Sequence, residues 1–208
     1  MAMNYRVLIL GGTGFIGRNL VDYIVRNNLA VKIRVVDKVP PQMAWLNSKH
    51  SESFANPIVE FKHSNLIHIS SVEKAFCDED GQFDFVINFA AETKYGQTEP
   101  VYKEGIERLS LNCAEVASRH RLKKFVEIST AQLYAGDKRL ASEDSHLDPW
   151  TNLARHKLEV EKNLASFGPD LNYVIVRPAI VYGLGDRTGL TPRIIIGSIY
   201  RYIRQKMQ

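Results

Sequence analysis

The sequence is poor in cysteine. Its 208 residues include only Cys77 and Cys113, with no CxxC pair and no histidine cluster near either. This scarcity argues against a disulfide framework and against a structural zinc site, and a chain of this length can bury a sizeable core without such cross-links. We therefore expect both side chains to be small, buried and reduced, and we expect no bound metal.

A long hydrophobic run is also lacking at the start of the chain. The four-residue run VLIL at 7–10 follows a single arginine and leads directly into two glycines. Such a run is too short for a signal peptide or for a membrane span. We therefore expect a cytoplasmic protein without a membrane partner.

No sign of charge dominates, because 27 basic and 23 acidic residues leave a net charge of only +4. The charges are dispersed apart from the basic segment RYIRQKMQ at 201–208. We interpret this as an ordinary solvated surface and expect no nucleic-acid partner. An RNA- or membrane-associated role is the alternative, and it would rest on the C-terminal positive charges of Arg193, Arg201, Arg204 and Lys206.

What the sequence does contain is an alternation of short β-branched runs with amphipathic stretches. The runs predict six strands, at 6–10, 31–37, 57–63, 83–90, 124–129 and 172–178. Several are apolar on both faces, as expected of a parallel sheet that helices cover on each side. The pattern predicts an α/β, doubly wound fold with right-handed crossovers. No repeat or linker interrupts it, so we expect a single domain over residues 1–208.

The helical stretches carry start signals of their own. We expect Ser70 or Ser71 to open a short helix, and Asp148 or Thr151 to cap the helix that contains WTNLARHKLEVEK at 150–162. In that helix, a charged residue, Lys157, interrupts an apolar stripe.

A glycine-rich motif, GGTGFIG at 11–17, directly follows the first strand and opens the first helix. Gly11 permits a tight turn, Gly14 lets the backbone approach a pyrophosphate, and Gly17 lets the helix pack closely. The free amides at the start of the helix are suited to receive phosphates. The motif in this context predicts a dinucleotide site, with a simple turn as the alternative.

An acid, Asp37, closes the second strand at the distance that such a site requires. A carboxylate there accepts the ribose hydroxyls of the adenosine half and repels a 2′-phosphate. We therefore predict NAD as the cofactor. Lys38, which is adjacent, could offset part of that repulsion and keeps NADP as an alternative.

The glycine motif, the strand-end acid and later segments together resemble the extended short-chain dehydrogenase/reductase family, the NAD(P)-dependent epimerase/dehydratase group. NFAAET at 88–93 is similar to that family's loop after the fourth strand, and HSNL at 63–66 to the Asp-Leu after its third. The resemblance covers nearly the whole chain and implies a Rossmann-type sheet of order 3-2-1-4-5-6. It also implies a set of cofactor-binding residues, namely Gly11, Thr13, Gly14, Phe15, Ile16, Gly17, Asp37, Lys38, Asn65, Leu66, Phe89, Ala90, Ala91, Lys157, Pro178 and Val181. For Asn65 an ordinary turn residue is the alternative.

The same resemblance implies a reaction centre. STAQLYAG at 129–136 is similar to the family's (S/T)(S/T)xxxYG segment, so Thr130 takes the place of the hydroxyl that bonds the reacting oxygen. Lys157 takes the place of the lysine in the family's Tyr-xxx-Lys, where it binds the nicotinamide ribose and lowers the tyrosine pKa. Leu153 stands at the tyrosine position and has no proton to transfer. Judged alone, Lys157 is as well explained by a packed stem with its head in water.

Further departures concern the substrate side. Ala131 and Gln132 stand where the family's dehydratases have Asp-Glu, which disfavours the usual 4,6-dehydratase mechanism. Ile180, in RPAIVYGLGD at 177–186, and Ile106 replace asparagines that are common in the family. Family members usually continue for roughly another hundred residues into a substrate-binding domain, so we expect that domain to be largely missing here.

We therefore predict an NAD(P)-binding protein of the epimerase/dehydratase/reductase group, acting on, or descended from enzymes acting on, sugar-like or nucleotide-sugar hydroxyl and carbonyl groups. A non-catalytic redox sensor or structural subunit that binds NAD(P) is the alternative. We treat His146 and His156 as surface histidines. As in family members, we expect a homodimer in which helices 100–118 and 150–166 form a four-helix bundle.

Overall fold

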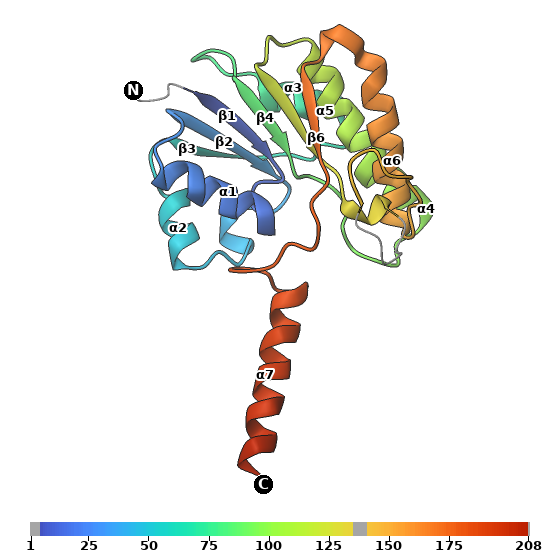
Figure 1. The fold of residues 1–208 in the computed structure, drawn as a ribbon. Helices are drawn as coiled ribbons and strands as arrows, with labels where there is room; N and C mark the ends of the chain where they lie inside the picture. Colours follow the sequence, from blue (N-terminus) through green and yellow to red (C-terminus); the bar gives the residue numbers. More distant parts are fainter. Residues whose placement is uncertain (1–4, 135–140, 208) are drawn as a thin grey trace.

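A computed structural model describes residues 5–134 and 141–207 (Figure 1). Ala135 and Gly136, which end the STAQLYAG segment, lie outside these residues. The strands are β1 Arg6–Leu10, β2 Lys32–Asp37, β3 Val59–His63, β4 Phe85–Asn88, β5 Lys124–Ile128 and β6 Tyr173–Val176. They form one parallel sheet of order β3-β2-β1-β4-β5-β6, which confirms the predicted fold class and strand order.

Helices occupy the connections between the strands. They are α1 Phe15–Arg26, α2 Ser48–Phe54, α3 Ile69–Phe76, α4 Glu99–Tyr102, α5 Leu109–Ser118, α6 Asn152–Leu164 and α7 Leu190–Lys206. A π-helical segment, Lys103–Arg108, joins α4 to α5, and 3-10 turns lie at Pro41–Met43, Ala131–Leu133 and Ala165–Asp170. The irregular stretch 38–56 thus contains a turn and the short helix α2.

Two apolar cores lie on the two faces of the sheet, with α1 and α2 over one face and α3, α5 and α6 over the other (Figure 1). Alternate residues of β1 divide between them. Val7 and Ile9 pack with Val21 of α1, whereas Leu8 and Leu10 belong to the core beneath α5 and α6. Because β1 is buried on both faces, its continuous apolar run is the pattern of a central parallel strand.

The register of the sheet brings the predicted site residues to one edge. Leu10, the last residue of β1, pairs with Val36 of β2 and with Asn88 of β4. The glycine-rich loop, Asp37 and the loop after β4 therefore all leave the sheet at its carboxyl edge, where ligands bind in open α/β sheets.

Some local predictions need correction. Cys77 follows α3 and is exposed, because it lies just beyond the last turn of that helix, whereas Cys113 of α5 is buried as predicted. Burial raises the pKa of the Cys113 thiol, and the nearby Glu127 carboxylate raises it further. The helix α3 begins at Ile69, with His68 before it, rather than after Ser70 or Ser71.

The segment after β6 leaves the sheet and ends in α7, which projects away from the body (Figure 1). Its aliphatic side chains are exposed, among them Ile196 at 66% and Ile199 at 53%. Val174 and Val176 of the edge strand β6 are also exposed. Within the residues described, no helix combines the length and the apolar character that crossing a membrane requires.

Candidate functional site

The glycine-rich loop adopts a conformation that only glycine supports at two of its positions. Gly11 has φ of +72°, and a Cβ added there would lie 2.5 Å from the backbone nitrogen of Ala90. A Cβ on Gly17 would lie 2.6 Å from the Cα of Gly12. The loop therefore packs directly against the loop after β4 and folds closely over the start of α1, which requires residues without side chains.

The start of α1 presents unused donors at this edge. Gly14 precedes the helix, is exposed, and offers no side chain to cap it. Within the described part of the chain, the amides of Phe15, Ile16 and Gly17 donate no hydrogen bond. Such amides, together with the helix dipole, suit an anionic group such as a pyrophosphate.

Asp37 is fixed beside this loop. Its Oδ2 accepts a hydrogen bond from the amide of Thr13 at 3.2 Å, and its Oδ1 accepts one from the amide of Val39 at 3.1 Å. The hydroxyl of Thr13 donates to the carbonyl of Val39 at 3.0 Å and joins the two segments. The carboxylate is half-buried and retains lone pairs that can accept ribose hydroxyls, while Lys38 beside it is exposed.

In the segment after β3, the two predicted residues, Asn65 and Leu66, make contacts within the protein. Asn65 is exposed, and its Oδ1 accepts a hydrogen bond from the amide of Ile67 at 3.2 Å. This contact is the local turn that we considered as the alternative for this residue. Leu66 is buried in the core beneath α5 and α6. A contact of either residue with an adenine ring stays a prediction.

The loop after β4 holds the predicted residues Phe89, Ala90 and Ala91. Asn88 is buried, and its Oδ1 accepts a hydrogen bond from the Ala90 amide at 3.1 Å, so the end of the strand fixes the loop. The Phe89 amide donates to the Leu10 carbonyl at 2.8 Å. Small residues at this point allow the approach of the glycine-rich loop.

Lys157 is buried on α6, with 5% of its surface exposed. Its Nζ donates to Oε1 of Glu127 at 3.0 Å, and Glu127, on β5, is completely buried. Ser110 Oγ donates to the same carboxylate oxygen at 3.0 Å, and Asn88 Nδ2 donates to the other at 2.7 Å. The ammonium group of Lys157 is therefore not in water, because it is bonded to a buried carboxylate that has three hydrogen-bonded neighbours, Lys157, Ser110 and Asn88.

Thr130 lies directly after β5, half-buried, and its Oγ1 accepts a hydrogen bond from the Gln132 amide at 3.2 Å. The Gln132 side chain connects this turn to α6, because its Oε1 accepts from the Thr151 hydroxyl at 2.9 Å. Thr151 in turn caps α6 by accepting from the Ala154 amide at 3.1 Å, which confirms it as the N-cap. Leu153, in the first turn of that helix, packs against the core.

The segment after β6 returns across this edge. The Pro178 carbonyl accepts a hydrogen bond from the Ala131 amide at 2.9 Å, whereas Val181 is exposed. Farther along, the Leu184 carbonyl accepts from Asn19 Nδ2 of α1 at 3.1 Å. The segment thus runs from the β6 edge of the sheet to the first helix and borders the carboxyl edge between them.

Comparison with known proteins decides the family. The sequence model described as "NAD dependent epimerase/dehydratase family" matches residues 7–207. The chain belongs to the NAD dependent epimerase/dehydratase family. Its description agrees with the predicted cofactor, NAD, and with the predicted group.

Individual members of the family are distant in sequence. A bifunctional UDP-glucose 4-epimerase and UDP-xylose 4-epimerase from Pisum sativum is 26% identical over 220 residues, which include 99% of this chain and 61% of that protein. A dTDP-glucose 4,6-dehydratase from Streptomyces niveus is 29% identical over 142 residues, covering 62% of this chain and 39% of that protein. The chain thus spans about three fifths of the pea enzyme's length.

The fold is shared with solved members of the family. The ADP-L-glycero-D-manno-heptose-6-epimerase of Helicobacter pylori superimposes with a TM-score of 0.78 at 22% identity, over 95% of this chain and 64% of that one. The UDP-glucuronic acid 4-epimerase of Bacillus cereus, solved in complex with NAD, superimposes with a TM-score of 0.75 at 22% identity, over 88% and 59%. These likenesses establish the fold.

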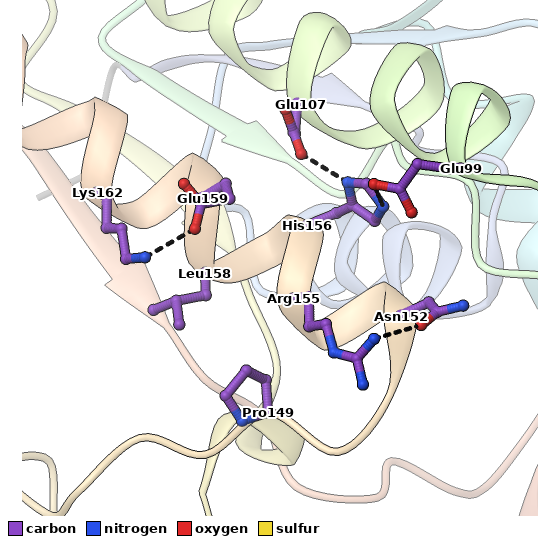
Figure 2. Close-up of a pocket in the computed structure, with 9 residues that line it drawn as sticks. All are labelled: Glu99, Glu107, Pro149, Asn152, Arg155, His156, Leu158, Glu159 and Lys162. Carbon is purple, nitrogen blue, oxygen red and sulfur yellow. Dashed lines mark hydrogen bonds and ion pairs between the residues drawn. The ribbon is translucent and has the colours of Figure 1, made fainter.

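A cavity of about 380 Å³ lies away from the residues that the family resemblance implies (Figure 2). It is bordered by α4, the π-helical segment and α6, and none of the predicted cofactor-binding residues lines it. His156 forms part of its wall. Its Nδ1 is 2.6 Å from Oε1 of Glu107 and its Nε2 is 3.3 Å from Oε1 of Glu99. His156 is 4% exposed, which corrects its assignment as a surface residue, whereas His146 is exposed as predicted.

Sequence reasoning missed two contacts near the predicted site residues, that of Glu127 with Lys157 and that of Tyr95 with Gln132. Glu127 interrupts the apolar strand run KFVEIS, and this interruption was the available signal for a buried partner of Lys157. Tyr95, whose hydroxyl accepts a hydrogen bond from Gln132 Nε2 at 3.1 Å, lies in a loop and gave no periodic signal. Among the residues described, no group of three or more His, Cys, Asp or Glu side chains is arranged to hold a metal ion.

Proposed function

We propose that this chain binds NAD along the carboxyl edge of β1, β2 and β4 as the cofactor-binding part of a protein that oxidises and reduces hydroxyl and carbonyl groups of nucleotide sugars. The observation that carries the proposal is the glycine-rich loop, closed over the start of α1 and tied to Asp37 through the Thr13 amide. The donors of that loop suit a pyrophosphate and the Asp37 carboxylate suits a ribose, so the residues present fit the dinucleotide.

Each residue has a separate task in this proposal. The amides of Phe15, Ile16 and Gly17 hold the pyrophosphate, and Asp37 accepts the adenosine ribose hydroxyls. When bound, NAD supplies the hydride acceptor of the reaction. The Thr130 hydroxyl donates a hydrogen bond to the reacting substrate oxygen, because its own lone pair already accepts from the Gln132 amide. A ribose contact by Lys157 requires its ammonium to reach beyond Glu127, to which it is bonded.

The substrate class comes from the relatives. The pea and Streptomyces proteins act, by their names, on UDP-glucose, UDP-xylose and dTDP-glucose. We propose a nucleotide sugar for this protein also, located in the cytoplasm, where the exposed thiol of Cys77 stays reduced.

Single-turnover mixing of the NAD-saturated chain with UDP-glucose, UDP-glucuronic acid or dTDP-glucose tests this function. We expect the absorbance of reduced nicotinamide to rise with at least one of the three sugars. Thr130→Val is expected to slow that step about 100-fold, as the loss of one donor to a developing oxyanion does. Thr188→Val, at an exposed threonine before α7, is the matched control and should leave the rate unchanged. Tight NAD binding without any reduction would instead support the non-catalytic sensor or subunit.

We also propose a homodimer through α5 and α6. Leu111 and Leu158 are half-buried on the outer faces of these helices, in keeping with a small apolar contact surrounded by charges, whereas Ala154 is completely buried within its own chain. Light scattering during size exclusion should give a dimer for the unmodified chain and a monomer for Leu158→Asp. Val31→Asp, at an exposed valine before β2, is the control, and a monomer before any substitution would contradict the proposal.

A further inference from the structure

The proposed function needs a group that exchanges a proton with the substrate near Thr130, and Leu153 cannot provide one. We propose that Tyr95, from the loop after β4, supplies this hydroxyl from the other side of the reaction centre. This inference rests on the proposed function and adds a catalytic residue to it.

A chain of side-chain hydrogen bonds links Tyr95 to the reaction centre. The Tyr95 hydroxyl oxygen accepts from Gln132 Nε2 at 3.1 Å, and Gln132 Oε1 accepts from the Thr151 hydroxyl at 2.9 Å. Gln132 lies two residues after Thr130, and Thr151 lies two residues before Leu153. Through Gln132, the Tyr95 hydroxyl is therefore linked to the two segments that the proposed reaction requires. These are the turn after β5 and the start of α6.

The loop that carries Tyr95 is anchored on both sides of it. The hydroxyl of Tyr102, a ring that is 1% exposed, donates to the Lys94 carbonyl at 2.8 Å and accepts from the Gln97 amide at 3.4 Å. The Glu92 amide donates to the Gly105 carbonyl at 2.9 Å. Gly105 belongs to the π-helical segment, and such segments are frequent at functional sites. Tyr95 itself is 69% exposed, so a fixed backbone presents a ring that a substrate can reach.

The direction of the Gln132 bond leaves the phenolic proton available. An amide nitrogen can only donate, so the Tyr95 oxygen is the acceptor in that contact. Within residues 5–134 and 141–207, the Tyr95 hydroxyl donates no hydrogen bond, and its one bond is the one that it accepts from Gln132. The same Gln132 donor would stabilise a phenolate once the proton has left.

Tyr134, which is nearer to Thr130 in the sequence, is the competing phenol. Its hydroxyl accepts from Arg177 Nη1 at 2.8 Å, and Arg177 is paired with Glu161 at 2.6 Å. Glu161 lies eight residues beyond Leu153 on α6, which corresponds to about 12 Å along the helix. Tyr134 therefore takes part in an ion-pair network farther along the helix, whereas Tyr95 is linked to the first turn.

The chemical step is balanced by proton and hydride transfer together. When a substrate carbonyl is reduced, its carbon receives a hydride from reduced nicotinamide and its oxygen receives the proton from Tyr95, so the C=O double bond becomes a C–H and an O–H bond. Tyr95 is left as a phenolate bonded to Gln132. In the oxidation of an alcohol the phenolate takes the proton back while the hydride returns to the oxidised nicotinamide.

Tyr95→Phe tests this assignment in the full chain. With NAD saturating and the most reactive of UDP-glucose, UDP-glucuronic acid and dTDP-glucose as the probe, we expect the single-turnover rate to fall about 100-fold, with the Kd for NAD unchanged. Tyr200→Phe is the matched control, because Tyr200 of α7 is also 69% exposed, and it should leave the rate unchanged. Transfer by Tyr95→Phe at a rate within about threefold of the unmodified chain would overturn the role of Tyr95 while the proposed function stands.

The variant Gln132→Leu distinguishes a role of Tyr95 in proton transfer from a role in the structure of its loop. Removal of the donor should move the pH at which the rate is half-maximal upward by about one unit, because a hydrogen bond to a charged group stabilises the phenolate. An unchanged pH profile would contradict the Tyr95 assignment. No hydride transfer from any of the three sugars by the unmodified chain, with NAD bound, would overturn the proposed function and the assignment together.

Discussion

The two halves of the sheet differ in how closely their geometry is constrained. In the first half, β1 to β3, the glycine-rich loop, Asp37 and the start of α1 meet at distances that leave no space for substitution at Gly11 or Gly17. In the second half, β4 to β6, Leu153 stands where the family resemblance implies a tyrosine, and Lys157 is bonded to the buried carboxylate of Glu127. Under the proposed function, binding of a dinucleotide and chemistry on a substrate are therefore separate demands on one sheet.

The reason for the difference is physical. A pyrophosphate is bound by backbone amides, so its site needs close approach of main chains and therefore particular glycines. A proton can come from any suitably placed hydroxyl, so the reaction centre tolerates a change of the residue that supplies it. The hydroxyl that we propose for this role is that of Tyr95, which is bonded to Gln132.

The largest loss of stability is expected when the buried hydrogen-bond network around Glu127, in the second half of the sheet, is broken. Glu127→Ala leaves the Lys157 ammonium buried without its partner, and we expect the free energy of unfolding to fall by about 3–5 kcal/mol. Denaturant titration measures this change. The double substitution Glu127→Leu with Lys157→Met removes both charges and should recover most of the loss. Equal losses in the single and double variants would show that the pair is not what stabilises this region.

In the first half of the sheet, the addition of a single methyl group to the glycine-rich loop should lower stability. Gly11→Ala places a Cβ against the Ala90 nitrogen at a positive φ, and we expect a loss of about 3 kcal/mol in unfolding free energy. Thermal unfolding is a suitable measurement. The control is Gly197→Ala in α7, where an added Cβ meets nothing within 4 Å, and it should not lower stability. A Gly11→Ala variant as stable as this control would contradict the tight fit of the loop.

The smallest effect that we expect is a pH dependence of stability that arises from Asp78, at the amino edge of the first half of the sheet. Burial raises the pKa of Asp78, but the hydrogen bond from Lys32 and the charges of Arg34 and Lys32 outweigh it, so the pKa is lowered overall. Because the folded-state pKa is the lower one, the stabilisation is complete above the unfolded value of about 3.9 and is lost as pH falls through the folded value.

Asp78→Asn should accordingly reduce the loss of stability on acidification, as measured by thermal unfolding between neutral pH and pH of about 3. Its NAD affinity should be unchanged, since Asp78 lies near Arg6 and Lys32, where β1 and β2 begin, far from the carboxyl edge. An acid response identical to that of the unmodified chain would exclude Asp78 as a source of the dependence.

The family resemblance supplied the order of the strands, and the local sequence offered Thr151 as one of two candidates for the cap of α6. Periodicity was sufficient to predict the six strands, because each strand is a local pattern. It did not reveal where side chains far apart in sequence meet. The bonds of Lys157 to Glu127, of His156 to Glu107 and of Tyr95 to Gln132 each span at least 30 residues. Helical spacing placed Lys157 on the apolar face of its helix, but it did not predict that the Glu127 carboxylate would be its partner there.

Calorimetric titration of the purified chain with NAD tests the central claim most directly. We predict saturable binding that is lost in Gly14→Val, because the new side chain at this exposed position blocks the start of α1. Its Cβ would lie 3.1 Å from the Gly11 carbonyl oxygen, so the variant is first shown to be folded by circular dichroism. Asp37→Ala should weaken NAD about tenfold and reduce the preference over NADP, as the loss of a charged hydrogen-bond acceptor does. Absence of NAD binding by an unmodified chain that circular dichroism shows to be folded would contradict the account.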